Sequence, residues 1–448
     1  MLRIFCALLI SWAAAPGAGH CAPVVRAPKV YPGALARYWS RAPLPSIGTP
    51  APKAYTRTSR TPITPLPDPI AAPRIAAISA SAAAPLNAPE TVDRAFAALQ
   101  PEPGRELTAP ALDRLFLGDS RPDAAAVSSA GGLVPGSWLP ENRQRLERLI
   151  RKYGRGGANW NPEHPPLAAF DWDNTMIRND VGEAVLYHAI RELRLKYDLG
   201  DAFWDLIPKK LGRDAWRASY EALQALPPDH IKQTPEYRRY LKLALAAYQR
   251  AKKDRSLKLD LAWRTRLFVG FEVSELEQLA DQAIDYELAR PLGVEYIRAD
   301  AADPLPVKIN TGLRPHREMF DLAAALQAAG WEVRVVSAST EWLAARFAAR
   351  AGISREHVHG TLVRLADGRL TDEVTQKTWG QGKADAVLKH AGRASLLAAG
   401  DSNIDREMLD LSQGEKLVIN FGREPLRAYA WLKGWMLQPP FDMRLRLR

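Results

Sequence analysis

Two carboxylates separated by one residue, Asp171 and Asp173, follow directly after a short apolar segment, residues 167–170. The apolar run has prolines before it and polar residues after it, which is typical of a buried parallel strand that ends at a loop. On an extended chain the two side chains point to the same side, about 6 to 7 Å apart, so both can face one bound group. Ligands of open α/β sheets gather at such strand ends, which favours an active site here. A turn rich in Asp and Asn would have the same local sequence.

Polar residues at three other strand ends or helix starts complement this pair. Ser337 ends an apolar β-run, Lys383 opens a helix, and Asp401 and Asp405 follow a further β-run. Carboxylates with Mg²⁺ and one lysine can hold an approaching phosphate dianion, and hydroxyl and main-chain N–H groups can complete its binding site. Each residue taken alone also has an ordinary structural explanation, as a strand-end hydroxyl, a solvated lysine or a carboxylate at a turn or helix start.

The order of these segments resembles the four motifs of the haloacid dehalogenase-like superfamily. They are DWDNT at 171–175, VVSAS at 335–339, GQGK at 380–383 and GDSNID at 400–405, within a matching region of residues 165–425. The resemblance implies a Rossmann-like core, dependence on Mg²⁺ and a phospho-aspartate intermediate.

The resemblance also implies a role for each matched residue. Asp171 would be the nucleophile and Asp173 the general acid and base, while Asp171, the main-chain carbonyl of Asp173 and Asp401 would bind Mg²⁺. A halide leaves as an anion, whereas an alkoxide leaving group needs a proton, and Asp173 stands where that acid belongs. The second aspartate therefore favours a phosphatase over a dehalogenase.

The remaining matched residues would bind phosphate or support the site. Thr175 and Ser337 would hold the phosphoryl oxygens, and Lys383 would neutralise the nucleophile and the phosphate. Asp405 would orient Lys383, with Asn403 as a further supporting residue of the fourth motif.

The rest of the folded region must position these residues. From residue 312 onwards helices are expected at 316–329, 341–351, 383–390 and 404–411, strands at 332–336, 396–399 and 417–421, and a hairpin at 358–374. This alternation predicts an α/β fold with a Rossmann-like parallel sheet. Residues 180–304 show only helical periodicity, which predicts an inserted all-helical cap domain. The catalytic core would then consist of residues 140–179, which begin with a helix, and residues 305–435.

The N-terminal region has a different composition. Residues 1–22 have a charged start and a short apolar stretch, which is typical of a signal peptide and too short to span a membrane. Export to the periplasm or outside the cell is therefore expected. Residues 23–139 form a Pro/Ala-rich, basic segment that is predicted to be a mostly disordered linker. Cys21 would be the single cysteine left after cleavage, so no disulfide is expected.

The net charge of +11 is concentrated in this linker, because residues 23–90 hold eight Lys/Arg and two Asp/Glu. Such a segment can favour contact with an anionic membrane or a cell-wall polymer as well as with a nucleic acid. The charge therefore predicts no nucleic-acid partner in particular.

The predicted cap narrows the substrate class. A helical cap between the first and second motifs resembles the phosphoserine phosphatase subgroup, and an exported chain with these motifs is similar to secreted bacterial phosphorylcholine phosphatases. Asp180 and Glu183, at the start of the cap, could each meet a substrate cation, or could instead be helix N-terminal carboxylates. A quaternary ammonium group would need an aromatic cage, for which several side chains are available, although aromatic residues at helical spacing are commonly core. They are Trp172, Tyr187, Trp204, Trp216, Tyr220 and Trp263.

The sequence thus predicts an exported, Mg²⁺-dependent phosphomonoesterase for a small polar ester such as phosphorylcholine. Phosphoserine or another small metabolite is an alternative substrate. A non-catalytic, surface-associated binding protein is the alternative of a different class.

Overall fold

The computed structural model describes residues 132–442. The predicted signal peptide, Cys21 and the predicted linker up to residue 131 lie outside the described residues. Residues 132–139, which were also predicted to belong to the linker, are part of the packed structure. Leu133 and Trp138 are buried, and the Val134 N–H donates to Asp321 Oδ2 at 2.9 Å. Within the described range, no helix is long and apolar enough to cross a bilayer.

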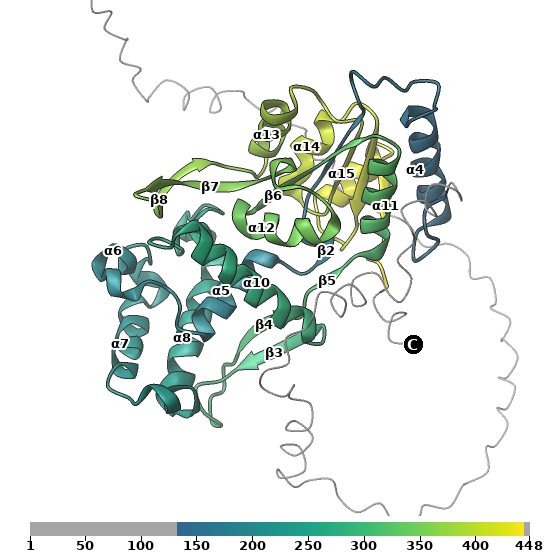
Figure 1. Ribbon diagram of the computed structural model, residues 1–448. Coiled ribbons are helices and arrows are strands. Elements are labelled where there is room, and N and C mark those ends of the chain that lie inside the picture. Colours follow the sequence, from purple (N-terminus) through teal and green to yellow (C-terminus); the bar gives the residue numbers. More distant parts are fainter. Residues whose placement is uncertain (1–131, 443–448) are drawn as a thin grey trace, which may run out of the picture. The chain divides into compact units, whose positions relative to one another are not determined.

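Seven strands form one sheet, which confirms the predicted Rossmann-like core (Figure 1). Their order is β11 (Met436–Gln438), β10 (Glu415–Ile419), β9 (Leu397–Gly400), β1 (Leu167–Phe170), β6 (Glu332–Thr340), β7 (Val358–Ala366) and β8 (Arg369–Gln376). All neighbouring strands are parallel except β7 and β8, which form the predicted antiparallel hairpin. Strand β11 at the edge of the sheet was not predicted.

Helices cover both faces of this sheet, so its central strand is apolar on both sides. Ala168 and Phe170 of β1 belong to the same apolar cluster as residues of the helices α4 (Pro140–Tyr153), α11 (Arg317–Ala328) and α12 (Glu341–Ala348). Leu167 and Ala169 belong to a second cluster with α13 (Gln381–Ala391) and α14 (Arg406–Leu411). The short helix α15 (Leu426–Leu432) packs on the same side as α14. Burial on both faces explains the uninterrupted apolar run before Asp171.

The chain between β1 and β6 contains the cap. Its helices are α5 (Val181–Arg191), α6 (Asp201–Trp204), α7 (Arg213–Leu223), α8 (Pro235–Lys253), α9 (Trp263–Arg266) and α10 (Val273–Ala289). The prediction of an all-helical cap is wrong in one element, because β3 (Gly293–Ile297) and β4 (Val307–Thr311) form an antiparallel hairpin. In β4 the apolar Val307 and Ile309 are buried and alternate with the exposed Lys308 and Asn310, so this strand carries an alternating signal that the prediction missed. In β3 the apolar Val294 and Tyr296 are both exposed.

Two short segments connect the cap to the core and pair with each other. They are β2 (Ile177–Arg178) and β5 (Arg314–Pro315). Asn179 ties the two connections together, since its amide donates to the carbonyls of Thr311 at 3.1 Å and Gly312 at 2.7 Å. Gly312 has a φ of +77°, and a Cβ there would lie 2.8 Å from the Pro291 carbonyl oxygen. This position therefore requires glycine.

Candidate active site

The two strands beside β1 bring the sequence-predicted residues together. Asp171 follows β1, and its N–H donates to the Ala399 carbonyl of β9 at 2.9 Å, so Asp401 lies on one side of it. Ser337 lies on the other side, within β6. The prediction that Ser337 ends this strand is wrong, because β6 continues to Thr340. The pairing of β6 with β1 nevertheless stops at Val335, and the register of β6 against β7 shifts after Val336. The hydroxyl of the buried Ser337 donates to Asp173 Oδ2 at 3.3 Å.

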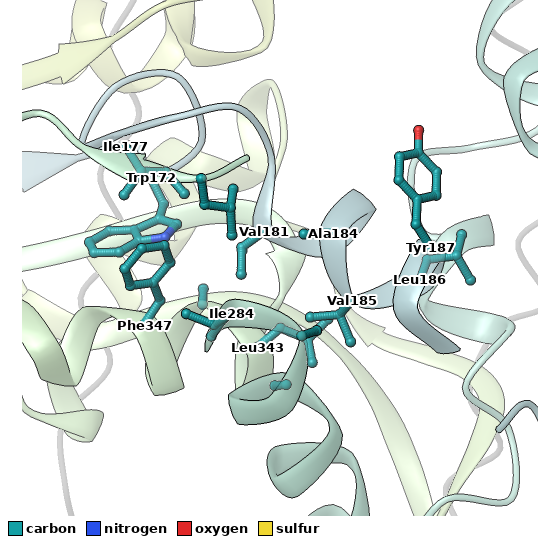
Figure 2. Packing of buried hydrophobic residues seen from close by; sticks show 14 of the residues in the cluster. Trp172, Ile177, Val181, Ala184, Val185, Leu186, Tyr187, Ile284, Leu343 and Phe347 are labelled. Atoms are coloured by element: carbon teal, nitrogen blue, oxygen red, sulfur yellow. The ribbon is translucent and has the colours of Figure 1, made fainter. Parts of the chain in front are cut away.

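Trp172, between the two aspartates, packs into the core. Its side chain is fully buried and lies against Phe347, with ring centroids 5.5 Å apart (Figure 2). Because side chains alternate along an extended chain, burial of Trp172 on the apolar side directs Asp171 and Asp173 to the other side. Trp172 therefore fixes the orientation of the pair and is not available to a substrate.

Both carboxylate oxygens of Asp171 have partners. Lys383 Nζ donates to Oδ1 at 2.5 Å, and Thr175 Oγ1 donates to Oδ2 at 2.8 Å. Burial, together with the charge of Asp405, raises the pKa of Asp171 to about 6. The carboxylate therefore remains mostly ionised at neutral pH.

Asp171, Asp401 and Asp405 form a compact buried cluster. One carboxylate oxygen from each lies within 4.8 Å of the other two. Lys383 also contacts Asp405, at 2.6 Å, and it is fully buried. Burial alone would lower the pKa of Lys383, but the two carboxylates that it contacts outweigh burial and raise it. One lysine thus serves two of the three carboxylates.

Asp405 also supports the loop that carries Asp401. Its Oδ2 accepts hydrogen bonds from the N–H groups of Asp401 at 3.1 Å and Ser402 at 2.9 Å. With Lys383 on its other oxygen, the predicted orienting role fits this geometry. Asn403, predicted as a supporting residue, is exposed at the start of the short helix that contains Asp405.

The side chain of Asp173 is directed to hydroxyl groups. Its Oδ2 accepts from Ser339 Oγ at 2.6 Å and from Ser337 Oγ at 3.3 Å, while Oδ1 accepts from the Val181 N–H at 2.7 Å. Burial, with the charges of Asp180 and Asp171, raises the pKa of Asp173 well above its ordinary value. A carboxyl group in this environment favours its protonated form.

Ser339 and Arg264 were not predicted to belong to the site. Arg264, on α9 of the cap, donates to Ser339 Oγ at 2.9 Å and to Asp180 Oδ1 at 2.8 Å. The chain of contacts from Asp180 through Arg264 and Ser339 ends on Asp173. It connects the cap to the predicted general acid.

Asp180 and Glu183, the predicted substrate contacts in the cap, have partners within the protein. Asp180 accepts from the Glu183 N–H at 2.8 Å and is the N-cap of α5. Burial opposes ionisation of Asp180, but Arg264 outweighs it and lowers the pKa. Glu183 accepts hydrogen bonds from Tyr248 at 3.2 Å and from Lys252. The helix N-terminal explanation therefore holds for Asp180, and a substrate cation would have to compete with protein cations at both carboxylates.

Most of the proposed cage aromatics are part of the interior of the cap. Tyr197 is stacked on Trp204, with centroids 5.2 Å apart, and also contacts Trp216 and Tyr220. Tyr187 hydrogen-bonds to Glu183 at 3.3 Å and meets Tyr248 edge to face. These aromatic residues stabilise the cap, and the structure does not assemble the six candidates into one cage.

A cavity of about 510 Å³ lies where the cap meets the loops of the site. From the core it is lined by Ala338 and Ile404, which lie within the second and fourth motifs, and by Trp379, which directly precedes the third. From the cap it is lined by charged and aromatic side chains, which include Asp180, Glu183, Tyr248, Lys252, Trp263 and Arg264. This volume is within the range typical of small-ligand sites.

Arg423 is a second arginine that sequence reasoning missed. It follows β10, and its Nη1 contacts Asp401 Oδ2. Burial and the charges of Asp171 and Asp405 raise the pKa of Asp401 well above its ordinary value. Even with Arg423 counted, the cluster has three carboxylates and two cations. A hard divalent cation, which prefers carboxylate oxygens, fits this donor set.

The comparisons with known proteins agree with the motif assignment. The sequence model of the haloacid dehalogenase-like hydrolases matches residues 168–410. A probable phosphatase of Mycobacterium tuberculosis strain H37Rv and an uncharacterized protein of M. tuberculosis strain CDC 1551 are each 28% identical over 176 residues. That alignment covers 38% of this chain and 52% of each relative, so the chain spans about half the length of the curated relatives it matches.

A solved structure shares the fold. It is a conserved, functionally unknown protein from Anaerococcus prevotii, with a TM-score of 0.60 and 22% sequence identity. The match covers 68% of this chain and 93% of the other. At this identity the similarity concerns the fold alone.

Proposed function

Since this chain belongs to the haloacid dehalogenase-like hydrolase family, we propose that it is a Mg²⁺-dependent phosphomonoesterase that works through a phosphorylated Asp171. The family match and the relative named a probable phosphatase support hydrolysis of phosphate esters. The observation that carries the proposal is the buried cluster in which Lys383 contacts two of three neighbouring carboxylates. A framework needs no such excess of buried negative charge, whereas a site for a divalent cation does, and the cation and Lys383 together can then attract a phosphate group.

In the first half of the reaction, Asp171 would attack the phosphorus atom of the ester. Its carboxylate is fixed by Lys383 on one oxygen and Thr175 on the other, and the charge of Lys383 offsets the repulsion between the carboxylate and the phosphate dianion. As the new P–O bond to Asp171 forms, the P–O bond to the leaving group breaks. The leaving oxygen takes its proton from Asp173, whose raised pKa suits a general acid.

In the second half, water would hydrolyse the phospho-aspartate. Asp173, now ionised, accepts a proton from the attacking water, and inorganic phosphate and free Asp171 result. Ser337 and Ser339 hold the Asp173 carboxyl group through both steps. The same residue thus acts first as an acid and then as a base.

Mg²⁺ would be held by Asp171, the main-chain carbonyl of Asp173 and Asp401. When bound, it would supply positive charge to the phosphoryl oxygens as the ester bond breaks. Asp405 belongs to the same carboxylate cluster, but its bonds to Lys383 and to two N–H groups suit a supporting role.

The substrate would be a small polar ester whose leaving group enters the cavity between cap and core. Phosphorylcholine remains a candidate, but its cation would have to displace Lys252 or Arg264 from the carboxylates that they contact. Phosphoserine carries both charges and could exchange partners with these ion pairs. A comparison of phosphorylcholine, phosphoethanolamine and phosphoserine as substrates distinguishes these possibilities.

Hydrolysis of p-nitrophenyl phosphate, with and without Mg²⁺, tests the activity. The wild-type protein should hydrolyse it only with Mg²⁺, and Asp171→Asn should lower kcat by at least about a thousand-fold. Equal activity of the two proteins would contradict the mechanism. A wild-type protein that binds phosphate esters without hydrolysing them would favour a binding protein instead.

A further inference from the structure

Arg423 gives the metal site a cation of its own. Asp401 is 4% exposed, and its Oδ2 is contacted by Arg423 Nη1. The Arg423 side chain is 44% exposed, so its guanidinium already borders solvent and has a path away from the cluster. The two partners therefore differ: the carboxylate is fixed in the cluster, and the cation can leave.

The charge of the cluster explains why this contact forms. Lys383 contacts Asp171 and Asp405, which leaves Asp401 as the carboxylate without a lysine partner in the cluster. A buried carboxylate with no cation is costly, because it has lost its hydration. Arg423 supplies the missing charge at Asp401.

The surroundings of Arg423 oppose a permanent contact. Its guanidinium lies 5.4 Å from the centre of the Phe421 ring, and that of Arg178 lies 4.7 Å from the same ring. The pKa of Arg178 is lowered by its burial and also by the charge of Arg423. The two guanidinium groups therefore repel each other. Where it contacts Asp401, the positive charge of Arg423 is therefore attracted by that carboxylate and repelled by Arg178.

We propose that Arg423 is an internal counter-ion that competes with the divalent cation for Asp401. This inference rests on the metal site of the proposed function. Because Asp401 Oδ2 cannot bind the guanidinium and a metal ion with full strength at once, metal binding includes the displacement of Arg423. The displacement raises the Mg²⁺ concentration at which the site fills, and it leaves a mobile cation at the edge of the site.

Calorimetric titration of Mg²⁺ into the full-length protein tests this competition directly. Arg423→Gln should bind Mg²⁺ about tenfold more tightly than the wild type, since the metal no longer displaces a cation. Arg427→Gln is the matched control, because it removes an equal charge nearby from an exposed arginine that pairs with Glu424. Its Mg²⁺ affinity should stay within about twofold of the wild type, because solvent and salt screen that charge.

Thermal unfolding separates direct contact from a general field effect. With EDTA, Arg423→Gln should unfold at a temperature several degrees below that of the wild type, since Asp401 has lost its counter-ion. Saturating Mg²⁺ should remove this difference. Equal Mg²⁺ affinities for Arg423→Gln and the wild type, or equal stability in EDTA, would overturn the role of Arg423 and leave the phosphatase mechanism intact. A wild-type protein with no Mg²⁺ binding would instead contradict the metal site itself.

Discussion

The core and the cap each contain a group of neighbouring carboxylates, but the charges of the two groups are balanced differently. In the core, Lys383 serves both Asp171 and Asp405, and Asp401 depends on an exposed arginine. In the cap, Asp180 is paired with Arg264 and Glu183 with Lys252.

The comparison separates carboxylates whose charge is neutralised within the protein from those whose charge is only partly neutralised. Asp180 has a lowered pKa, because Arg264 outweighs burial, so its charge is already satisfied. Burial and nearby carboxylates raise the pKa of Asp171 and Asp401. In the proposed mechanism, the carboxylates that share too few cations form the site of chemistry, and the fully paired ones stabilise the cap beside it.

Removal of the proposed acid should have the largest effect. Asp173→Asn should lower kcat on an alkyl phosphate by about 10²- to 10⁴-fold, because the leaving oxygen no longer receives a proton. The loss should be smaller on p-nitrophenyl phosphate, whose leaving group is stable as an anion. Asp180→Asn, the matched change in the cap, should retain most of the activity on p-nitrophenyl phosphate. Equal losses on the two substrates would argue against Asp173 as the acid.

Breaking the cap pair should cost stability first. Arg264→Gln leaves Asp180 without its cation, and the free energy of unfolding should fall by about 2 to 3 kcal/mol. The double variant Asp180→Asn/Arg264→Gln should recover part of this loss, because no unpaired charge remains. Urea unfolding measures both. A double variant no more stable than Arg264→Gln would show that Asp180 gains nothing from the pair.

His359 is a buried side chain among basic residues, the opposite case to the carboxylate cluster of the core. Burial, with His390 and Arg334, lowers the pKa of His359 to about 3, and the His390 ring is stacked on it at 3.9 Å. Between pH 6.5 and this value the unfolded chain binds more protons than the folded one, so stability falls as the pH falls.

Between pH 6.5 and 5, the free energy of unfolding of His359→Gln should fall by about 1 kcal/mol less than that of the wild type. The measurement is urea unfolding across that range. His164→Gln, at an exposed histidine, is the control and should follow the wild type. A wild-type pH profile in His359→Gln would refute the assignment.

The smallest effect is expected at the second cap pair. Lys252 is 42% exposed, so solvent screens its interaction with Glu183. Lys252→Met should therefore lower the free energy of unfolding by only about 1 kcal/mol. Comparison with Arg264→Gln by urea unfolding ranks the two pairs. A larger loss for Lys252→Met would mean that Glu183, and not Asp180, depends most on its cation.

The core of the site could be predicted because parallel strands bring their carboxyl ends to one edge. Asp171, Ser337 and Asp401 each follow or lie in neighbouring strands, so local patterns were enough to bring them together. Trp172, which was a candidate for the aromatic cage, is instead buried on the opposite side of the extended chain from the two aspartates.

The contacts that were missed join residues from unrelated local patterns. Arg264 lies 84 residues from Asp180, on a helix of four residues with no distinctive signal. Arg423 lies in the loop after β10, and Ser339 lies within β6, one residue before the N-cap Thr340 of α12. Side-chain pairing across the cap and the core depends on packing that no single segment encodes.

The most direct test of the central claim is to detect phosphate on Asp171. In Asp173→Asn, Asp171 should still attack the phosphorus atom of p-nitrophenyl phosphate, but the phospho-aspartate should break down slowly, because the base for the attacking water is missing. After brief reaction with Mg²⁺ and p-nitrophenyl phosphate and an acid quench, mass spectrometry of the digested protein should find phosphate on the peptide that contains Asp171. Phosphate on a different residue, or hydrolysis with no covalent phosphate, would contradict the account.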